Sequence, residues 1–314
     1  MDSKYESILL SKPFTFIVGP HKKQYIMHEA AVSRLSKTLD QLLHGGMRES
    51  EERCVCWEDL DEKTFLRFGE WTYTGDYKPE EPEILLDASQ ITSAEAKDSE
   101  ENPKSEPICP SLAAISASLL WKHCGQERTL TYDKSCDNRS CRRTFASRRC
   151  QVCGAYQFAN CVSCRGVAVR IPNKQKVITT FTSGAKYKSP TTSHEARKNT
   201  ESCEDYSEVF LSHALLYTLA DKYDIPELSQ LSIHKLYVTL KEFTIYEDRI
   251  GDIVGLVKYS FKNTIPGDKL RALMVEYCTC IVEGICNSKE FQDLINEAPE
   301  FASELIKEMV KRLD

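Results

Sequence analysis

The sequence has no apolar run long enough to cross a bilayer and none of the short motifs that mark common catalytic sites. A membrane-spanning helix needs ~18 or more consecutive apolar residues, and residues 1–10 lack the apolar core of a secretory signal. The chain has no Gly-x-Ser-x-Gly elbow, no Gly-Lys-Ser/Thr phosphate loop and no His-Glu-x-x-His zinc motif. We therefore expect an intracellular protein of the cytoplasm or nucleus, with no membrane contact and no enzyme activity.

Charge is unevenly distributed along the 314 residues, although the net charge is only -6. Residues 122–198 contain sixteen Lys and Arg against four acidic residues, so this stretch is strongly basic and the remainder of the chain is acidic. Such a stretch indicates either an anionic partner or attraction between the stretch and its own acidic chain. Both explanations stay open.

Fourteen cysteines are present, and in an intracellular chain they are thiols or metal ligands before they are disulfides. Two Cys-x2-Cys pairs separated by seven residues can place four thiolates around one zinc ion, and a Cys-x4-Cys pair lies just upstream. These candidate ligands are Cys150, Cys153, Cys161, Cys164, Cys136 and Cys141.

The upstream Cys-x4-Cys pair has two alternative roles. Together with His123 or Cys124 it forms a second zinc site, or it takes the place of one Cys-x2-Cys pair in the first site. Because a four-thiolate site leaves no open position for water or substrate, the zinc is expected to be structural. The alternative is a set of reduced cysteines without metal.

Residues 14–43 predict a hairpin followed by helical structure. The runs at 14–18 and 25–27 are rich in β-branched and aromatic residues, and a Gly-Pro pair follows the first run, which favours a β-hairpin. Apolar residues then recur at helical spacing up to residue 43, with Ser36 as a plausible helix cap.

A third strand and another amphipathic helix are predicted next. The strand covers residues 53–57. One face of the following helix carries Phe65, Phe68, Trp71 and Thr72.

Three polar residues in this region have structural explanations. His28 falls at the junction between a strand and a helix, which favours a structural role over a catalytic one. Asp59 and Asp61 are explained by a turn and a helix cap.

In this order the residues resemble the BTB/POZ domain, most closely the BTB proteins that fungi carry in large numbers. The matching positions are Val18, Gly19, Tyr25, His28, Leu35, Ser36, Leu39, Glu49, Ser50, Asp59, Leu60, Asp61, Thr64, Phe65, Phe68, Trp71, Tyr73, Thr74, Gly75 and Tyr77. Residues 209–228 resemble the fourth and fifth helices of that family. The resemblance implies an α+β fold of the BTB/POZ type, a small sheet capped by helices, which is split by the cysteine-rich insert and extended by a C-terminal all-helical region.

The resemblance and the composition divide the chain into five parts. These are the N-terminal part of the BTB/POZ domain at 12–77, an acidic linker with prolines at 78–107, the basic cysteine-rich insert at 108–204, the closing helices of the domain at 205–242, and a helical extension at 243–314. Within the insert, residues 110–124 predict a helix that packs on the main domain, and residues 167–171 and 177–181 predict two strands around a Pro-Asn turn.

The resemblance implies a protein–protein interaction module. BTB domains self-associate or act as substrate adaptors that dock on a cullin scaffold of a ubiquitin ligase, so the expected partners are a second copy of the chain or a cullin. A second hypothesis is a zinc-dependent nucleic-acid-binding or transcription-related protein that uses its BTB part for assembly. That hypothesis depends on the basic residues near the cysteine pairs: Arg139, Arg142, Arg143, Arg148 and Arg149.

Overall fold

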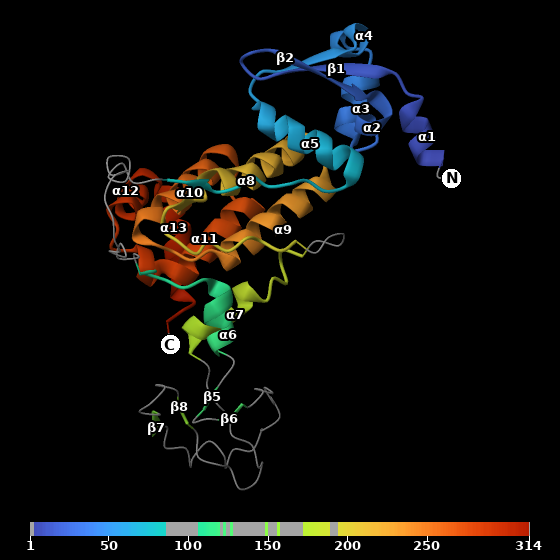
Figure 1. Ribbon diagram of the computed structural model, residues 1–314. Coiled ribbons are helices and arrows are strands. Elements are labelled where there is room, and N and C mark those ends of the chain that lie inside the picture. The colour runs from blue at the N-terminus through green and yellow to red at the C-terminus, as the bar shows by residue number, and fades with distance from the viewer. Residues whose placement is uncertain are drawn as a thin grey trace, which may run out of the picture.

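The computed structural model describes residues 3–85, 106–119, 172–188 and 194–313, together with the short strand pairs at 122–123, 126–127, 148–149 and 156–157. The protein is a mixed α+β protein in which a small sheet with its helices adjoins a larger body of helices (Figure 1). The N-terminus lies at the end that carries the sheet, and the C-terminus lies beside helix α7 of the helical body.

The sheet has three strands in the order β2-β1-β3. β1 (Pro13–Val18) pairs antiparallel with β2 (Lys23–His28) and parallel with β3 (Cys54–Trp57). The predicted hairpin and third strand are therefore confirmed. Gly19 begins the hairpin turn with a φ of +71°, a conformation that glycine adopts without steric cost.

Five helices accompany this sheet along the chain. They are α1 (Ser3–Leu9), α2 (Glu29–Ser33), α3 (Lys37–His44), α4 (Arg48–Glu52) and α5 (Glu62–Thr74). The side chain of Ser36 caps α3 and that of Asp61 caps α5, as the sequence predicts, and each satisfies a backbone N–H that the helix itself leaves unpaired. Gly75 ends α5 with a φ of +81°.

The core beneath the sheet is completed by a helix from much later in the chain. Phe16, Phe65 and Phe68 lie in one buried cluster with Leu216 and Leu219 of α8 (Ser207–Lys222). Helix α8 therefore supplies the apolar partner of α5. Phe210 of the same helix faces a second cluster of buried residues.

The second cluster fills the helical body. Its elements, in addition to α8, are α6 (Leu112–Leu119), α7 (Asn173–Thr182), α9 (Pro226–Glu242), η3 (Glu247–Arg249), α10 (Ile250–Asn263), α11 (Lys269–Ile285), α12 (Lys289–Glu297) and α13 (Pro299–Val310). A two-stranded ribbon of β4 (Glu83–Ile84) and β9 (Glu204–Asp205) runs beside this body. Leu112 of α6 is fully buried, which confirms the predicted helix that packs back on the body.

The strand predicted at 177–181 is wrong, since these residues form the second half of α7. Ile178 and Phe181 are three residues apart, so on a helix they share one face, and that face is buried against the helical body. The β-branched residues between them suit a strand by propensity alone, but packing decides the conformation. The other predicted strand, at 167–171, lies outside the described residues.

The short strands in the cysteine-rich part pair as β5 (Lys122–His123) with β6 (Gln126–Glu127) and β7 (Arg148–Arg149) with β8 (Tyr156–Gln157).

Within the described residues, no helix combines the length and apolar character that crossing a membrane requires.

Candidate functional site

The six predicted zinc ligands lie outside the residues that the structure describes. They are Cys136, Cys141, Cys150, Cys153, Cys161 and Cys164. In the described part of the chain, no group of three or more His, Cys, Asp and Glu side chains is arranged to hold a metal ion. The zinc site therefore stays a prediction from spacing.

His28 is held by a tyrosine of α5. Its backbone N–H donates to the hydroxyl of Tyr73 at 3.0 Å, and its Nδ1 atom lies 3.0 Å from the same oxygen. These contacts fix the end of β2 against α5. They agree with the structural role expected for His28.

A groove between the sheet and the helical body is a candidate binding site. Its volume is about 540 Å³, within the range typical of ligand pockets. One wall comes from α3, β3 and the turn after β3, and the opposite wall comes from α8 and α10. The lining residues are Leu42, Val55, Cys56, Trp57, Glu58, Asp59, Leu60, Leu215, Thr218, Leu219, Asp221, Lys222, Tyr223, Tyr259 and Asn263.

Aromatic contacts fix the inner wall of this groove. The ring of Trp57 stacks on that of Tyr223 with centroids 4.7 Å apart, and it meets Phe16 of β1 edge-on at 5.1 Å. Burial raises the pKa of the Tyr223 hydroxyl to about 12. Across the groove, the hydroxyls of Tyr259 and Thr218 share a 2.7 Å hydrogen bond, which ties α10 to α8. The walls are thus held in place before any ligand binds.

Acidic side chains outnumber basic ones around the groove. Glu58, Asp59 and Asp221 line it together with one cation, Lys222. Glu58 pairs with Lys22 at 3.2 Å, but both side chains are more than half exposed, so this ion pair contributes little. The groove thus has an apolar and aromatic floor and an acidic rim. This combination suits a ligand that inserts an apolar side chain and carries basic residues beside it.

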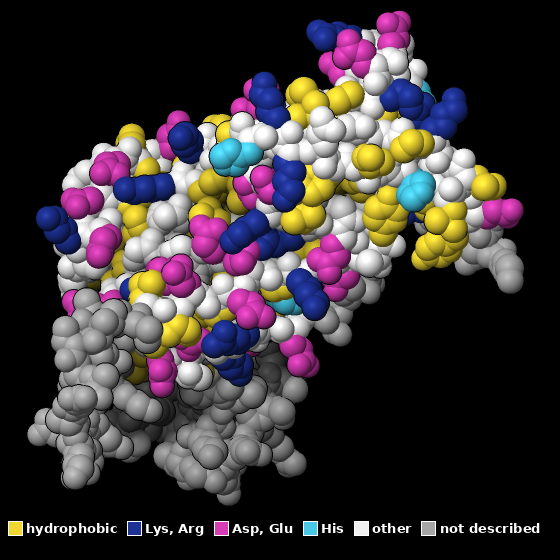
Figure 2. Space-filling view, turned by 45° about the horizontal axis from the view of Figure 1, so that its top comes forward, with side chains coloured by type: hydrophobic (Ala, Val, Ile, Leu, Met, Phe, Trp, Pro, Cys, Tyr) yellow, Lys and Arg dark blue, Asp and Glu magenta, His cyan; other side chains and the backbone are white. Residues whose placement is uncertain are grey.

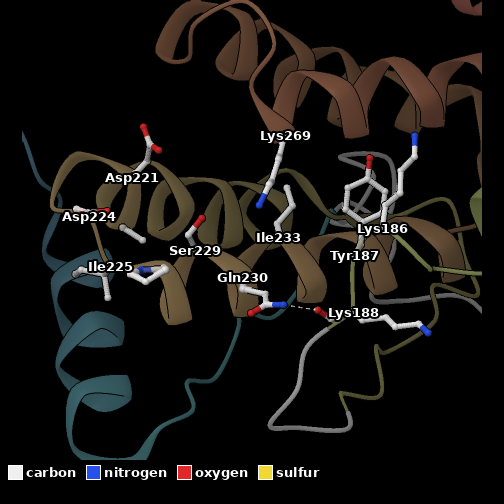
Figure 3. Close-up of a pocket in the computed structure, with 12 residues that line it drawn as sticks. Lys186, Tyr187, Lys188, Asp221, Asp224, Ile225, Ser229, Gln230, Ile233 and Lys269 are labelled. Carbon is white, nitrogen blue, oxygen red and sulfur yellow. Dashed lines mark hydrogen bonds between the residues drawn. The ribbon is translucent and has the colours of Figure 1, made fainter. Parts of the chain in front are cut away.

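A second pocket lies on the other side of the α8–α9 turn and encloses about 360 Å³ (Figure 3). Lys269 reaches from the start of α11 toward Ile233 of α9, while Asp221 and Asp224 lie at the end formed by the turn. Charges of both signs mix here, and Lys186 is already paired with Glu276. The pocket shows no preference for a ligand of one charge, so the groove is the stronger candidate.

The visible surface of the helical body also carries no large field of one sign. Acidic and basic side chains alternate over the face shown in Figure 2. A broad electrostatic platform for nucleic acid is not found on that face among the described residues.

Sequence patterns did not reveal the groove. They placed Trp57 in a strand and Tyr223 in a helical segment, 166 residues further along the chain. The two rings come into contact only because α8 packs beneath the sheet. The available signal was local: Trp57 is followed directly by two acidic residues, Glu58 and Asp59.

Comparisons of the chain with protein-family models, with curated proteins and with solved structures find no match. Any function proposed for the chain therefore depends on its own residues and their arrangement.

Proposed function

We propose that the protein is a BTB-type interaction module that binds protein partners through the groove between β3 and α8. The observation that carries this proposal is the shared core. Two segments of the chain resemble the BTB/POZ domain, and more than a hundred residues separate them. Phe65 and Phe68 of the first segment pack against Leu216 and Leu219 of the second, and the groove lies where the two segments meet.

The chemistry of the groove supports a peptide or helix as its ligand. The rigid Trp57 and Tyr223 wall offers an apolar surface, and the acidic rim favours a partner that carries Lys or Arg beside its apolar anchor. We propose an adaptor that docks on a cullin-type scaffold or a similar partner.

Self-association is a second mode that the same module supports. Tyr5, Leu9 and Leu10, in and just after α1, expose more than half of their surface at the end of the molecule that carries the sheet. Exposed apolar groups of this size are suited to burial against another chain.

The test is affinity purification of the full chain from its native cells, followed by mass spectrometry and by direct binding of the recovered partner. The variant Glu58→Lys/Asp221→Lys reverses two rim charges without touching the core and is expected to weaken binding at least tenfold. Asp293→Lys, an exposed reversal on α12, is the matched control. Equal binding by both variants would place the partner elsewhere and refute the groove.

The basic stretch supports a second candidate function, zinc-dependent binding of nucleic acid. Sixteen Lys and Arg within residues 122–198 favour an anionic partner. Titration of DNA and RNA at rising salt tests this function. Affinity that falls steeply with salt supports it, and no binding at low salt excludes it.

A further inference from the structure

Four buried or half-buried polar side chains form one cluster between the segment that follows α5 and the segment that begins at residue 194. Tyr77 follows α5, His213 lies on α8, Lys235 lies on α9, and His194 begins the returning segment. We call these four residues the histidine latch. They join three parts of the chain that are distant in sequence.

Tyr77 is the centre of the latch. Its hydroxyl forms a 2.7 Å hydrogen bond with Nδ1 of His213, and both residues are buried. Lys235 donates to the Tyr77 carbonyl oxygen at 2.6 Å and places its ammonium 4.2 Å from the centre of the Tyr77 ring. Asp76 neutralises that ammonium at 2.5 Å.

His194 completes the latch by packing against His213. The two rings are 6.1 Å apart and nearly perpendicular. The Nε2 atoms of both histidines are buried and have no hydrogen-bond partner among the described residues. Neutral rings tolerate this arrangement, but a proton on either ring would create a buried charge without a partner.

Burial and nearby cations oppose protonation of both rings. Burial, with smaller effects from Lys235 and His234, lowers the pKa of His194 to about 4, whereas Asp76 raises it. Burial also lowers the pKa of His213 well below its usual range, and His194, Lys235 and Arg67 of α5 add to this.

We propose that the histidine latch is an acid-sensitive fastening that holds residues 194–196 on α8 and α9 and releases them when His194 gains a proton. The groups that face the two histidines come from every neighbouring element. They are Arg67 from α5, Asp76 and Tyr77 from the strap after α5, and His234 and Lys235 from α9. Asp76 already pairs with Lys235, and Arg67 pairs with Glu80, so a new imidazolium charge would compete with Lys235 for Asp76.

The release has a defined limit along the chain. Asn199 is buried and exchanges two hydrogen bonds with the backbone of Thr244, at 2.6 and 2.7 Å. Arg197 is also held, because its guanidinium pairs with Glu204 at 2.6 Å and its carbonyl oxygen accepts the hydroxyl of Tyr206 at 3.2 Å. Residues from Arg197 onward are therefore expected to stay in place when the latch opens. Acid would free only the segment at which the chain returns from its cysteine-rich part.

Hydrogen exchange of the full chain tests this proposal. The pKa of His194 is lower in the closed state than the ordinary value of 6.5. The neutral ring therefore stabilises the closed state at pH values above 6.5, and this stabilisation is lost as the pH falls toward 4. The opening constant of residues 194–196, corrected for intrinsic exchange, should rise about 30-fold from pH 7.5 to pH 5.0. The amide of Thr244, which donates to Asn199, should stay protected.

His194→Phe keeps a ring but cannot gain a proton, so its residues 194–196 should have the same opening constant at both pH values. His21→Phe, at an exposed turn, is the control and should behave as wild type. If the opening constant of wild-type residues 194–196 does not rise in acid, or if it rises in His194→Phe as in wild type, the latch is wrong. Titration of the histidine rings by NMR tests the latch in the wild-type protein. The latch is also refuted if His194 titrates near its ordinary pKa while the segment stays protected from exchange.

Discussion

The hydroxyl of Ser36 donates a 2.6 Å hydrogen bond to the carbonyl oxygen of Tyr223, 187 residues further along the chain. The Oγ atom of Ser36 also accepts the backbone N–H of Leu39 at 3.1 Å and so caps α3. One side chain thereby starts a helix beneath the sheet and fastens the end of α8 to it. The groove wall at Tyr223 depends on this fastening.

Ser36→Ala should destabilise the protein by about 1 to 2 kcal/mol, because it removes a helix cap and leaves the Tyr223 carbonyl without its partner. Urea denaturation measures the loss. Ser50→Ala is the matched control, since the Ser50 hydroxyl bonds only to Met47 within its own turn. Equal losses in the two variants would show that the long-range bond contributes nothing.

Leu216→Ala and Phe210→Ala should damage different cores, although both residues lie on α8. Each should cost about 2 to 5 kcal/mol, because each side chain is fully buried. Leu216→Ala should reduce hydrogen-exchange protection chiefly in the sheet and α5, and Phe210→Ala chiefly in α9 and α10. Leu66→Ala, on the exposed face of α5, should change stability by less than about 0.5 kcal/mol.

Limited proteolysis provides an independent check on the first core. A stable fragment that ends near Lys78 is not expected, because it would lack Leu216 and Leu219. Recovery of such a fragment would contradict the shared core.

The carboxyl group of Asp252 should make stability depend on pH. It is buried and accepts the backbone N–H of Tyr206 at 2.8 Å. Burial raises its pKa to about 6, against the lowering effects of that hydrogen bond and of Arg249. Because the folded pKa exceeds the ordinary value of 3.8, protonated Asp252 stabilises the fold at low pH, and this effect is lost as pH rises through about 6.

Asp252→Asn should therefore remove this contribution to the slope of the free energy of unfolding between about pH 4 and 7. Urea denaturation at several pH values measures the slope. Asp293→Asn, on the exposed face of α12, should keep the wild-type slope. An Asp252→Asn slope equal to that of wild type would contradict a raised pKa.

Purified protein should contain zinc, and Cys153→Ser should lose it. Two Cys-x2-Cys pairs supply four thiolates, and structural zinc in small modules contributes about 10 to 16 kcal/mol to folding at neutral pH. Metal analysis together with hydrogen exchange checks both points. The helical cores should keep their protection in the variant. Less than about half an equivalent of zinc in wild type would favour reduced cysteines instead.

Elements with strong local signals could be predicted from the sequence. The hairpin of β1 and β2 follows from two short β-rich runs beside Gly19, and the start of α5 follows from the Asp61 cap. α7 could not be predicted in this way, because its β-branched residues favour a strand, and contacts with α9 and α11 stabilise the helix instead. Local propensity fails where packing between distant segments dominates.

The candidate sites were the least predictable features for the same reason. His213 stands on an apolar helix face, and that unusual position was a signal in the sequence, but its neighbours Tyr77 and His194 approach it only through the fold. The groove likewise needs Trp57 and Tyr223 to meet. The spacing of the cysteines, in contrast, is entirely local.

The pairing of α6 with α7 has a consequence for how this chain tolerates change. Ser116 and Thr182 are joined by a 3.1 Å hydrogen bond between their hydroxyls, and the end of α6 and the start of α7 lie at the same end of the body (Figure 1). The entropy of closing a loop grows only with the logarithm of its length, about 0.6 kcal/mol for each doubling. We therefore expect that the chain between these helices can be lengthened, or replaced by a short Gly-Ser linker, at little cost to the stability of the two cores.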